Sequence, residues 1–187
     1  MNNANATVIL VVAHTDYQPV EYGVTYDILA SNTIQVATVS NKPGVATATD
    51  GSTTVVNNTL DEINPINYQG LFIIGGKGAL EHLNIPVMHE LLRQFKALGK
   101  PYGAICIAPR ILAQAQVLGT VKATGWDDDH ELARVFERYG AQYTRKAVVT
   151  DGLVVTAQGP EVVQDFAEAI IRVVQAYQQE QQRRLAS

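Results

Sequence analysis

The chain contains a single cysteine, Cys106, and the residues around it predict an activated thiol. The apolar segment Tyr102–Ile105 ends directly before Cys106, and Pro109 is suited to begin a helix shortly after it. We expect the N–H groups and dipole of that helix to favour the thiolate and to lower the pKa of the thiol. Tight turns of this kind also strain the backbone of the nucleophile. The same residues fit a second interpretation, in which Cys106 is a small buried core residue.

Glu21 is the candidate acid partner of this thiol. It lies on the first turn of a helix predicted for residues 19–30, at the end of the sheet where Cys106 also emerges. A carboxyl group that is buried beside a thiolate has its pKa raised by desolvation and by like charge. It then donates and accepts a proton near neutral pH, as general acid–base catalysis requires. The alternative is that Glu21 only complements the dipole of its own helix.

Two glycines and the residue after the cysteine supply candidate donors for a developing oxyanion. Gly75 and Gly76 end the apolar run 71–74, and we expect their backbone N–H groups to face Cys106 together with that of Ile107. Glycine permits the close approach that such a donor cluster requires. The alternative is a simple strand-ending turn with positive φ angles.

Four further side chains are candidates for the wall of a pocket. His14 follows the first predicted strand and is therefore topologically close to Glu21. Trp126 and His130 follow a short strand predicted at residues 121–124. Arg110, one turn into the helix after Cys106, either attracts an anionic substrate or pairs with an acid. The four histidines are scattered along the chain, so we expect no metal site, and we expect no cofactor.

The elements that position these residues alternate between buried strands and amphipathic helices. Apolar, β-branched runs predict strands at residues 7–13, 34–40, 71–74, 102–105 and 121–124. Apolar residues at helical spacing predict helices at residues 19–30, 86–98, 108–117, 129–139 and 162–177. Residues 41–58 predict a small β excursion, and Asp151-Gly152 predicts a hairpin between residues 147–150 and 153–156. This order predicts an α/β fold with helices on both faces of a mostly parallel sheet and the site at the carboxyl ends of its strands.

Length, charge and composition limit the classes of protein to which the chain can belong. A length of 187 residues predicts one domain over residues 1–187, in which the polar stretch 178–187 frays or projects into solvent. The net charge of −4 and the lack of basic clusters argue against nucleic-acid binding. No apolar run approaches the roughly 20 residues of a membrane span, and the N-terminus lacks the basic region of a signal peptide. The single cysteine excludes an internal disulfide, so we expect a cytoplasmic protein.

Several segments, in the same order along the chain, together resemble the ThiJ/PfpI superfamily. They are Pro-Val-Glu at residues 19–21, Ile-Ile-Gly-Gly-Lys-Gly at 73–78, Ala-Ile-Cys-Ile-Ala-Pro-Arg-Ile-Leu at 104–112, Lys-Ala-Thr-Gly-Trp at 122–126, Thr-Asp-Gly-Leu-Val-Val-Thr-Ala-Gln-Gly-Pro at 150–160 and Asp-Phe-Ala at 165–167. The resemblance implies a flavodoxin-like three-layer α/β/α sandwich with Cys106 at a strand-to-helix elbow. It also implies that Glu21 is protonated and hydrogen-bonds the cysteine sulfur, and that the protein is a homodimer with the site near the interface.

Three positions depart from the pattern of this superfamily. Some members carry a histidine directly after the cysteine, where this chain has Ile107. Deglycase-type members often carry a histidine after the elbow helix, at a position that Trp126 occupies here. The loop of residues 13–19 is also a few residues longer. These departures leave open which residue replaces the missing histidine.

The resemblance implies an enzyme acting on a small-molecule electrophile, and conversion of a 2-oxoaldehyde to a 2-hydroxy acid is the first expectation. In that glyoxalase- or deglycase-like chemistry, Cys106 adds to the carbonyl, Glu21 relays a proton and N–H groups hold the oxyanion. Isonitrile hydration and amidase-like hydrolysis are alternatives. A non-enzymatic sensor, in which Cys106 oxidises to sulfinate beside Glu21, uses the same residues. A scaffold with a decayed site is expected if Trp126 and Ile107 close the pocket.

Overall fold

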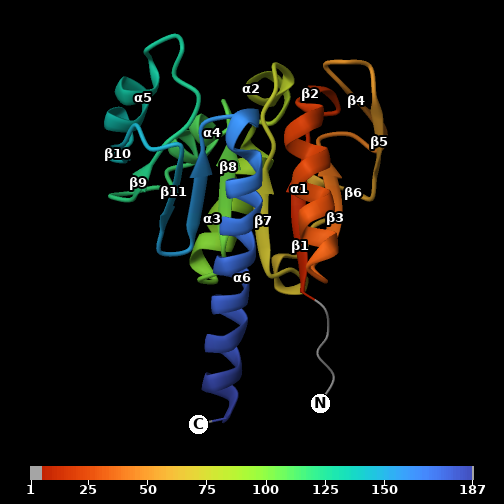
Figure 1. The fold of residues 1–187 in the computed structure, drawn as a ribbon, viewed down its shortest axis with the longest axis vertical. Helices are drawn as coiled ribbons and strands as arrows, with labels where there is room; N and C mark the ends of the chain where they lie inside the picture. The colour runs from red at the N-terminus through yellow and green to blue at the C-terminus, as the bar shows by residue number, and fades with distance from the viewer. Residues whose placement is uncertain (1–5, 187) are drawn as a thin grey trace.

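A central sheet organises the computed structural model, which describes residues 6–186 (Figure 1). Its strands are Thr7–Val11 (β1), Gln35–Ser40 (β3), Asn58–Thr59 (β6), Gly70–Ile73 (β7), Tyr102–Ile105 (β8), Val148–Asp151 (β11) and Val154–Ala157 (β12). Their order across the sheet is β11-β12-β8-β7-β1-β3-β6. Every neighbouring pair is parallel except β11 and β12, which form the predicted antiparallel hairpin. The predicted mostly parallel sheet is confirmed.

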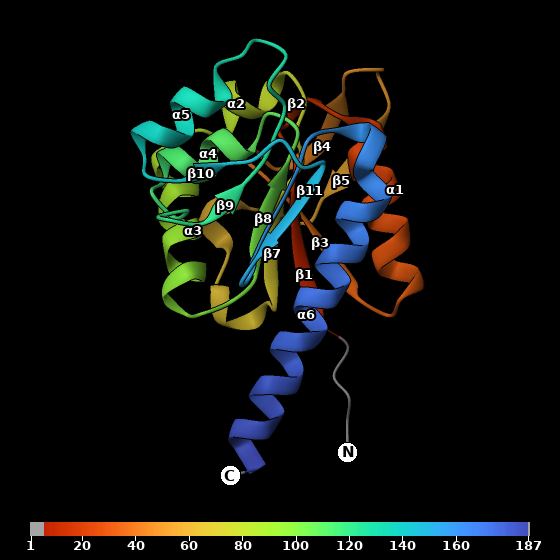
Figure 2. The same ribbon diagram turned by 60° about the vertical axis from the view of Figure 1, so that its left-hand side comes forward.

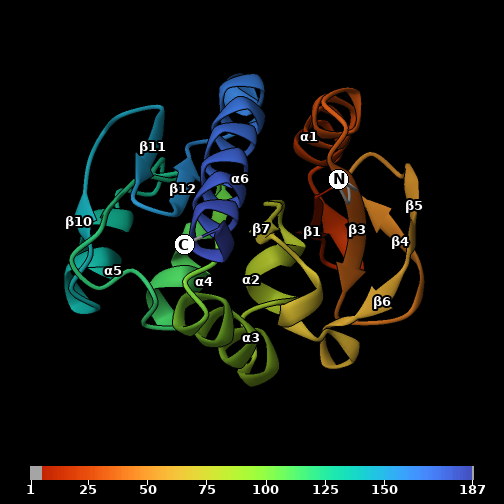
Figure 3. The ribbon, with the colours of Figure 1, turned by 90° about the horizontal axis from the view of Figure 1, so that it is seen from below.

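Helices cover both faces of this sheet and produce the predicted three layers (Figure 3). The helices Pro19–Ser31 (α1) and Val163–Ala186 (α6) pack side by side on one face. The other face carries Gly78–His82 (α2), Pro86–Ala97 (α3), Pro109–Gln114 (α4) and Leu132–Arg138 (α5). Along β1, Val8 and Leu10 join the core under α1 and α6, whereas Ile9 and Val11 join the core under α3 and α4. Burial on both faces explains why central strands such as β1 and β7 are almost continuous apolar runs rather than alternating ones.

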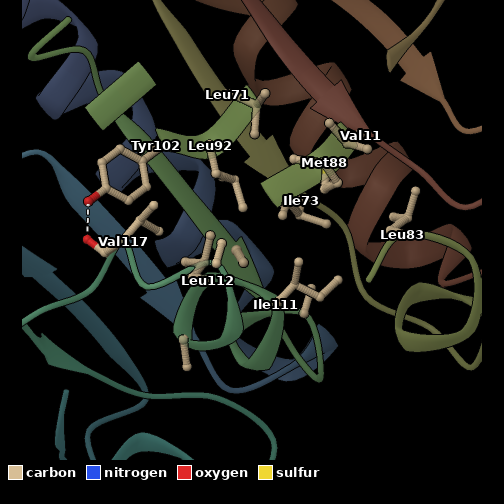
Figure 4. Packing of buried hydrophobic residues seen from close by; sticks show 14 of the residues in the cluster. Val11, Leu71, Ile73, Leu83, Met88, Leu92, Tyr102, Ile111, Leu112 and Val117 are labelled. Carbon is tan, nitrogen blue, oxygen red and sulfur yellow. Dashed lines mark hydrogen bonds between the residues drawn. The ribbon is translucent and has the colours of Figure 1, made fainter. Parts of the chain in front are cut away.

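The core around α3 and α4 fixes the helix that follows Cys106 (Figure 4). Leu92 of α3 packs with Ile111 and Leu112 of α4 against the strand residues on this face of the sheet. The Tyr102 hydroxyl, at the start of β8, donates a hydrogen bond to the carbonyl of Val117 after α4 at 2.7 Å. The strand before Cys106 and the helix after it are therefore tied together at their far ends as well as at the turn.

Two smaller sheets lie beside the central one. Thr15–Tyr17 (β2), Gly44–Ala48 (β4) and Thr53–Val56 (β5) form a three-stranded sheet, which confirms the predicted β excursion. Lys122–Ala123 (β9) pairs in parallel with Gln142–Tyr143 (β10). Short 3₁₀ helices span Leu60–Glu62, Pro65–Asn67 and Pro160–Val162.

Some helix ends differ from the predictions. The helix α4 ends at Gln114 rather than at residue 117, since Gln116 adopts a positive φ of 60° that does not continue a helix. The helix α5 begins at Leu132 rather than at residue 129. Asp127 accepts a hydrogen bond from the Leu132 N–H, and the residues between them form a turn.

The last helix differs most from its prediction. It continues past Tyr177 to Ala186 and projects from the body of the molecule (Figures 1 and 2). The polar stretch thus projects as expected, but as helix rather than as a frayed end. Its Gln, Glu, Arg and Leu residues are good helix formers, and Arg184 donates to Glu180 one turn earlier at 3.0 Å. No helix in residues 6–186 is both long and apolar enough to cross a membrane.

Candidate active site

Cys106 occupies a strained elbow at the carboxyl end of β8. Its φ angle is 63°, in the left-handed region that costs a non-glycine residue about 1 kcal/mol or more. Hydrogen bonds at both the N–H and the carbonyl of Cys106 hold this backbone conformation. The Cys106 N–H donates to the Ala157 carbonyl at the end of β12 at 3.0 Å, and the Cys106 carbonyl accepts from the Trp126 N–H at 2.7 Å. The predicted strained turn between strand and helix is confirmed.

Glu21, on the first turn of α1, reaches the same point from the other helix layer. Its side chain is fully buried, and Oε2 accepts a hydrogen bond from the Gly75 N–H at 2.8 Å. No described residue donates a hydrogen bond to Oε1, which is also buried. Burial raises the pKa of Glu21 to about 7, and the hydrogen bonds from Gly75 and from the Cys106 thiol act against this rise. The sequence thus correctly placed a buried carboxyl group beside the thiol.

The pKa of the Cys106 thiol does not follow the prediction. Burial, and then the charge of an ionised Glu21, raise the pKa of this thiol to about 12. The N–H groups of Gly76 and Ile107 hydrogen-bond the sulfur and lower the pKa, but with smaller effect. The expected lowering by a helix N-terminus is therefore wrong for the protein with Glu21 ionised. The sulfur is partly buried against a second acid, and Pro109 at the start of α4 has no N–H to offer.

Cys106 and Glu21 titrate as a pair. The charge of Glu21 repels a thiolate only while Glu21 is ionised, and a protonated Glu21 is a hydrogen-bond donor to the sulfur instead. The first proton leaves this pair near pH 7, the value to which burial raises the pKa of Glu21. Above that pH the pair holds one proton. The proton lies either on the sulfur, beside an ionised carboxylate, or on Glu21, beside a thiolate, and both arrangements have the same charge.

The two glycines have different roles. The N–H of Gly75 is occupied by Glu21, so it is not a free oxyanion donor as predicted. A Cβ on Gly75 would lie 2.5 Å from the Cβ of Cys106 and 2.8 Å from Oε2 of Glu21, so only glycine allows these side chains to meet. Gly76 has a φ of 109° and, like Ile107, directs its N–H at the sulfur. These two N–H groups fit the predicted donor cluster.

A cavity of about 710 Å³ opens above Cys106. Trp126 and His130 line it as expected. Its other lining residues are Gly125, Asp127, Asp128, Tyr143, Arg145 and the segment 158–161. Although Trp126 forms part of the wall, it does not seal the cavity, and Ile107 packs on the core instead. The closed pocket expected of a decayed site is therefore not observed.

Several of these lining residues were not predicted from the sequence. The segment 158–161, with Gln158 and Glu161, follows β12, which is the neighbour of β8 in the sheet. The rule that sites gather at the carboxyl ends of adjacent parallel strands could have found it. Tyr143 ends β10 and Arg145 follows it, and no sequence pattern predicted the position of β10 beside β9.

Two predicted pocket residues lie elsewhere. His14 does not line the cavity, and its backbone joins it to Asn41 and to Thr47 of the three-stranded sheet. Arg110 is buried and forms a two-bond ion pair with Asp129, at 2.6 and 3.0 Å. Of the two predicted roles of Arg110, pairing with an acid is the one that the structure supports. Residues 6–186 contain no group of three or more His, Cys, Asp or Glu side chains that could hold a metal ion.

The elbow, the buried acid and the overall topology can be compared with known proteins. The model of the DJ-1/PfpI family matches residues 6–173. The chain belongs to the DJ-1/PfpI family. This membership confirms the resemblance noted in the sequence.

Individual members of the family show how close the likeness is. Deglycase PfpI of Pyrococcus furiosus is 31% identical over 156 residues, covering 81% of this chain and 90% of that protein. Glutathione-independent glyoxalase DJR-1.2 of Caenorhabditis elegans is 23% identical over 172 residues, covering 92% and 90%. The crystal structure of a ThiJ/PfpI domain protein from Brachyspira murdochii superposes with a TM-score of 0.86 at 23% identity, covering 91% and 96%. The last of these likenesses bears on the fold alone.

Proposed function

We propose that this protein is a cysteine-dependent enzyme that converts 2-oxoaldehydes to 2-hydroxy acids, with Cys106 as nucleophile and Glu21 as acid and base. One observation carries the proposal. A fully buried carboxyl group whose pKa is raised to about 7 lies against a strained cysteine that lines a cavity. Two family members support the class of reaction, because they are named as a deglycase and a glyoxalase.

The first step is addition of the Cys106 sulfur to the aldehyde carbon. The arrangement that reacts is the one in which Glu21 holds the proton and Cys106 is a thiolate, and a sulfur–carbon bond forms as the carbonyl electrons move to oxygen. The N–H groups of Gly76 and Ile107, which already point at the sulfur, are placed to stabilise the oxyanion. Glu21 then supplies its proton to that oxygen, which gives a neutral thiohemiacetal and an ionised carboxylate.

The second step moves a proton between the two substrate carbons. Ionised Glu21 takes the proton from the carbon bonded to sulfur, and an enediolate anion forms. Glu21 returns this proton to the neighbouring carbon, the hydroxyl proton of the first carbon passes to the oxygen of the second, and the thioester of a 2-hydroxy acid results. A water molecule then attacks the thioester and breaks the sulfur–carbon bond, which releases the acid and restores the thiol. The overall change is the addition of one water, so no oxidant or reductant is needed.

This scheme assigns the proton transfers to Glu21 without a histidine. General acid–base catalysis by one positioned group contributes about 10²–10⁴-fold to a rate. The scheme therefore does not require the histidine that deglycase-type members often carry where this chain has Trp126.

The test is turnover of methylglyoxal and phenylglyoxal, followed by NMR detection of the hydroxy acid. Cys106→Ala should abolish product formation, and Glu21→Gln should lower kcat by about 100-fold or more. Glu168→Gln, which removes a carboxylate paired with Arg172 on the exposed face of α6, should leave turnover unchanged. Product formation that survives Cys106→Ala, or none in the wild type, would contradict the proposal. Including an isonitrile and a simple amide in the same assay tests the alternative reactions.

A second candidate function has support from the same donors. The N–H groups of Gly76 and Ile107 and a protonated Glu21 surround the sulfur, and they would equally stabilise the oxygens of a sulfinate. A cysteine-oxidation sensor would take up two oxygen atoms at Cys106 at low peroxide concentration, as seen by mass spectrometry. Stable sulfinate in the wild type but not in Glu21→Gln, without turnover of any carbonyl, would favour the sensor.

A further inference from the structure

One wall of the Cys106 cavity is a segment without regular secondary structure. This wall segment, residues 126–130, runs between β9 and α5 and contributes Trp126, Asp127, Asp128 and His130 to the cavity lining. Its backbone includes the positive φ of His130, at 57°. Because the segment belongs to neither a helix nor a strand, its conformation depends on side-chain contacts and a few backbone hydrogen bonds.

Arg110 contacts both ends of the wall segment. Its guanidinium donates to both carboxylate oxygens of Asp129, at 2.6 and 3.0 Å, and to the Trp126 carbonyl at 3.5 Å. The same guanidinium lies 5.5 Å from the centre of the Trp126 ring, within cation–π range. Arg110 is itself buried in α4, which the core holds in place. One side chain therefore connects the elbow helix with two residues of the wall segment, Trp126 and Asp129.

The other described contacts of the wall segment hold its backbone or join it to α5 and β10. The Trp126 N–H donates to the Cys106 carbonyl, which fixes the start of the segment. Asp127 accepts from the Leu132 N–H at 2.8 Å and from the Tyr143 hydroxyl at 2.9 Å. The Trp126 indole N–H donates only within the segment, to Asp128 at 3.1 Å. Among the described hydrogen bonds, ion pairs and ring contacts, Arg110 is thus what links the indole to the elbow helix.

We propose that Arg110 is a positioning residue of the Cys106 site: its guanidinium holds Trp126 and Asp129 so that the indole sets the width of the cavity above the sulfur. Arg110 does not line the cavity, so it acts on substrates only through the wall segment. Its effect on turnover rests on the proposed function, in which small carbonyl compounds reach Cys106 through this opening. The planar guanidinium suits this role, because it makes two parallel bonds to a carboxylate while stacking on an aromatic ring.

The first test uses the fluorescence of Trp126, which is the only tryptophan of the chain. In Arg110→Met, acrylamide quenching of Trp126 should rise about twofold or more and its emission should shift to the red, because the indole loses its cation partner. Arg110→Lys should stay closer to Arg110→Met than to the wild type, since an ammonium cannot form the two parallel bonds. The matched control is Arg172→Met, which removes an exposed arginine paired with Glu168, and it should change neither quantity.

The second readout is the size selectivity of Cys106. The rate of reaction with pyrene maleimide relative to iodoacetamide should rise severalfold in Arg110→Met, because a released indole widens the opening. If Arg110→Met fails to fold, Asp129→Asn keeps the buried arginine and weakens the same ion pair, so that both readouts should move in the same direction.

A folded Arg110→Met or Asp129→Asn variant with wild-type quenching and wild-type reagent selectivity would overturn the proposal. A change in thermal stability with no change in the two readouts would likewise show that Arg110 only supports the fold. Neither readout requires turnover of a carbonyl. A wild type that does not convert oxoaldehydes would therefore contradict the proposed function without deciding the role of Arg110.

Discussion

Two hollows of similar size lie at opposite ends of the central sheet. The one at the amino ends of the strands, about 790 Å³, lies between the projecting part of α6 and the segments that contain Ile66 and Lys100. Its charged group, Lys100, is satisfied, because the ammonium donates to the carbonyls of Pro65, Ile66 and Tyr68 at 2.6–2.9 Å. The hollow at the carboxyl ends, about 710 Å³, contains Cys106.

The two hollows have similar volumes but differ in the chemistry of the residues beside them. Beside the smaller hollow, Cys106 is strained at a φ of 63°, and Oε1 of Glu21 is buried without a described hydrogen-bond partner. A strained cysteine beside a buried carboxyl group with a raised pKa is typical of a functional site. Volume alone would have pointed to the end of the sheet that lacks this pair.

The largest expected effect concerns Glu21, at the carboxyl ends of the strands: its titration should make the free energy of unfolding depend on pH. The pKa of Glu21 is about 7 in the folded protein, against an ordinary value of 4.5, so the folded state holds more protons between these values. The free energy of unfolding should therefore fall as pH rises from about 4 to 8, by about 3 kcal/mol more in the wild type than in Glu21→Gln. Urea unfolding at the two pH values measures this difference. Glu168→Gln, the exposed control, should keep the wild-type slope; an equal slope in Glu21→Gln would mean that Glu21 is not the titrating group.

A somewhat smaller effect is expected at the other end of the sheet. Lys100→Met leaves three carbonyl groups without their donor and should lower the free energy of unfolding by about 2 kcal/mol. It should not alter the alkylation rate of Cys106, because the two ends are separated by the length of the strands. Lys42→Met, at an exposed turn, should change neither stability nor rate. Altered Cys106 reactivity in folded Lys100→Met would show that the two ends are not independent.

The smallest effect is expected from Glu161, which lines the cavity with Cys106. The charge of Glu161 is the least of the causes that act on the pKa of Glu21, and it raises that pKa. Glu161→Gln should therefore move the first ionisation of the pair slightly to lower pH, most clearly at low salt, where surface charges are least screened. The midpoint of the pH dependence of alkylation measures this shift. A shift to higher pH would contradict the assigned direction.

The sequence predicted the fold and the proximity of Cys106 and Glu21 because both depend on local patterns. Buried strands such as β1 are continuous apolar runs, and the elbow is marked by an apolar run, Cys106 and Pro109 in close succession. Glu21 was placed correctly because a helix start after a parallel strand lies at the strand's carboxyl end.

What the sequence did not predict depends on contacts between distant segments. The pKa of Cys106 was assigned the wrong direction, because burial and the charge of Glu21 outweigh the local N–H groups. The partner of Arg110 lies 19 residues away, at Asp129, across a segment without periodicity. His14 was expected near the site because of its place in the topology, but the three-stranded sheet holds its backbone instead.

The most direct test of the account is the pH dependence of Cys106 alkylation by iodoacetamide in the wild type and in Glu21→Gln. If the thiol and the carboxyl group share their protons, the wild-type rate rises through an inflection near pH 7, where the pair loses its first proton. Glu21→Gln should lose that inflection and show a single ionisation of Cys106 alone. A wild-type rate with one inflection near the free-thiol value of about 8.5, unchanged by Glu21→Gln, would contradict the coupled site on which the account depends.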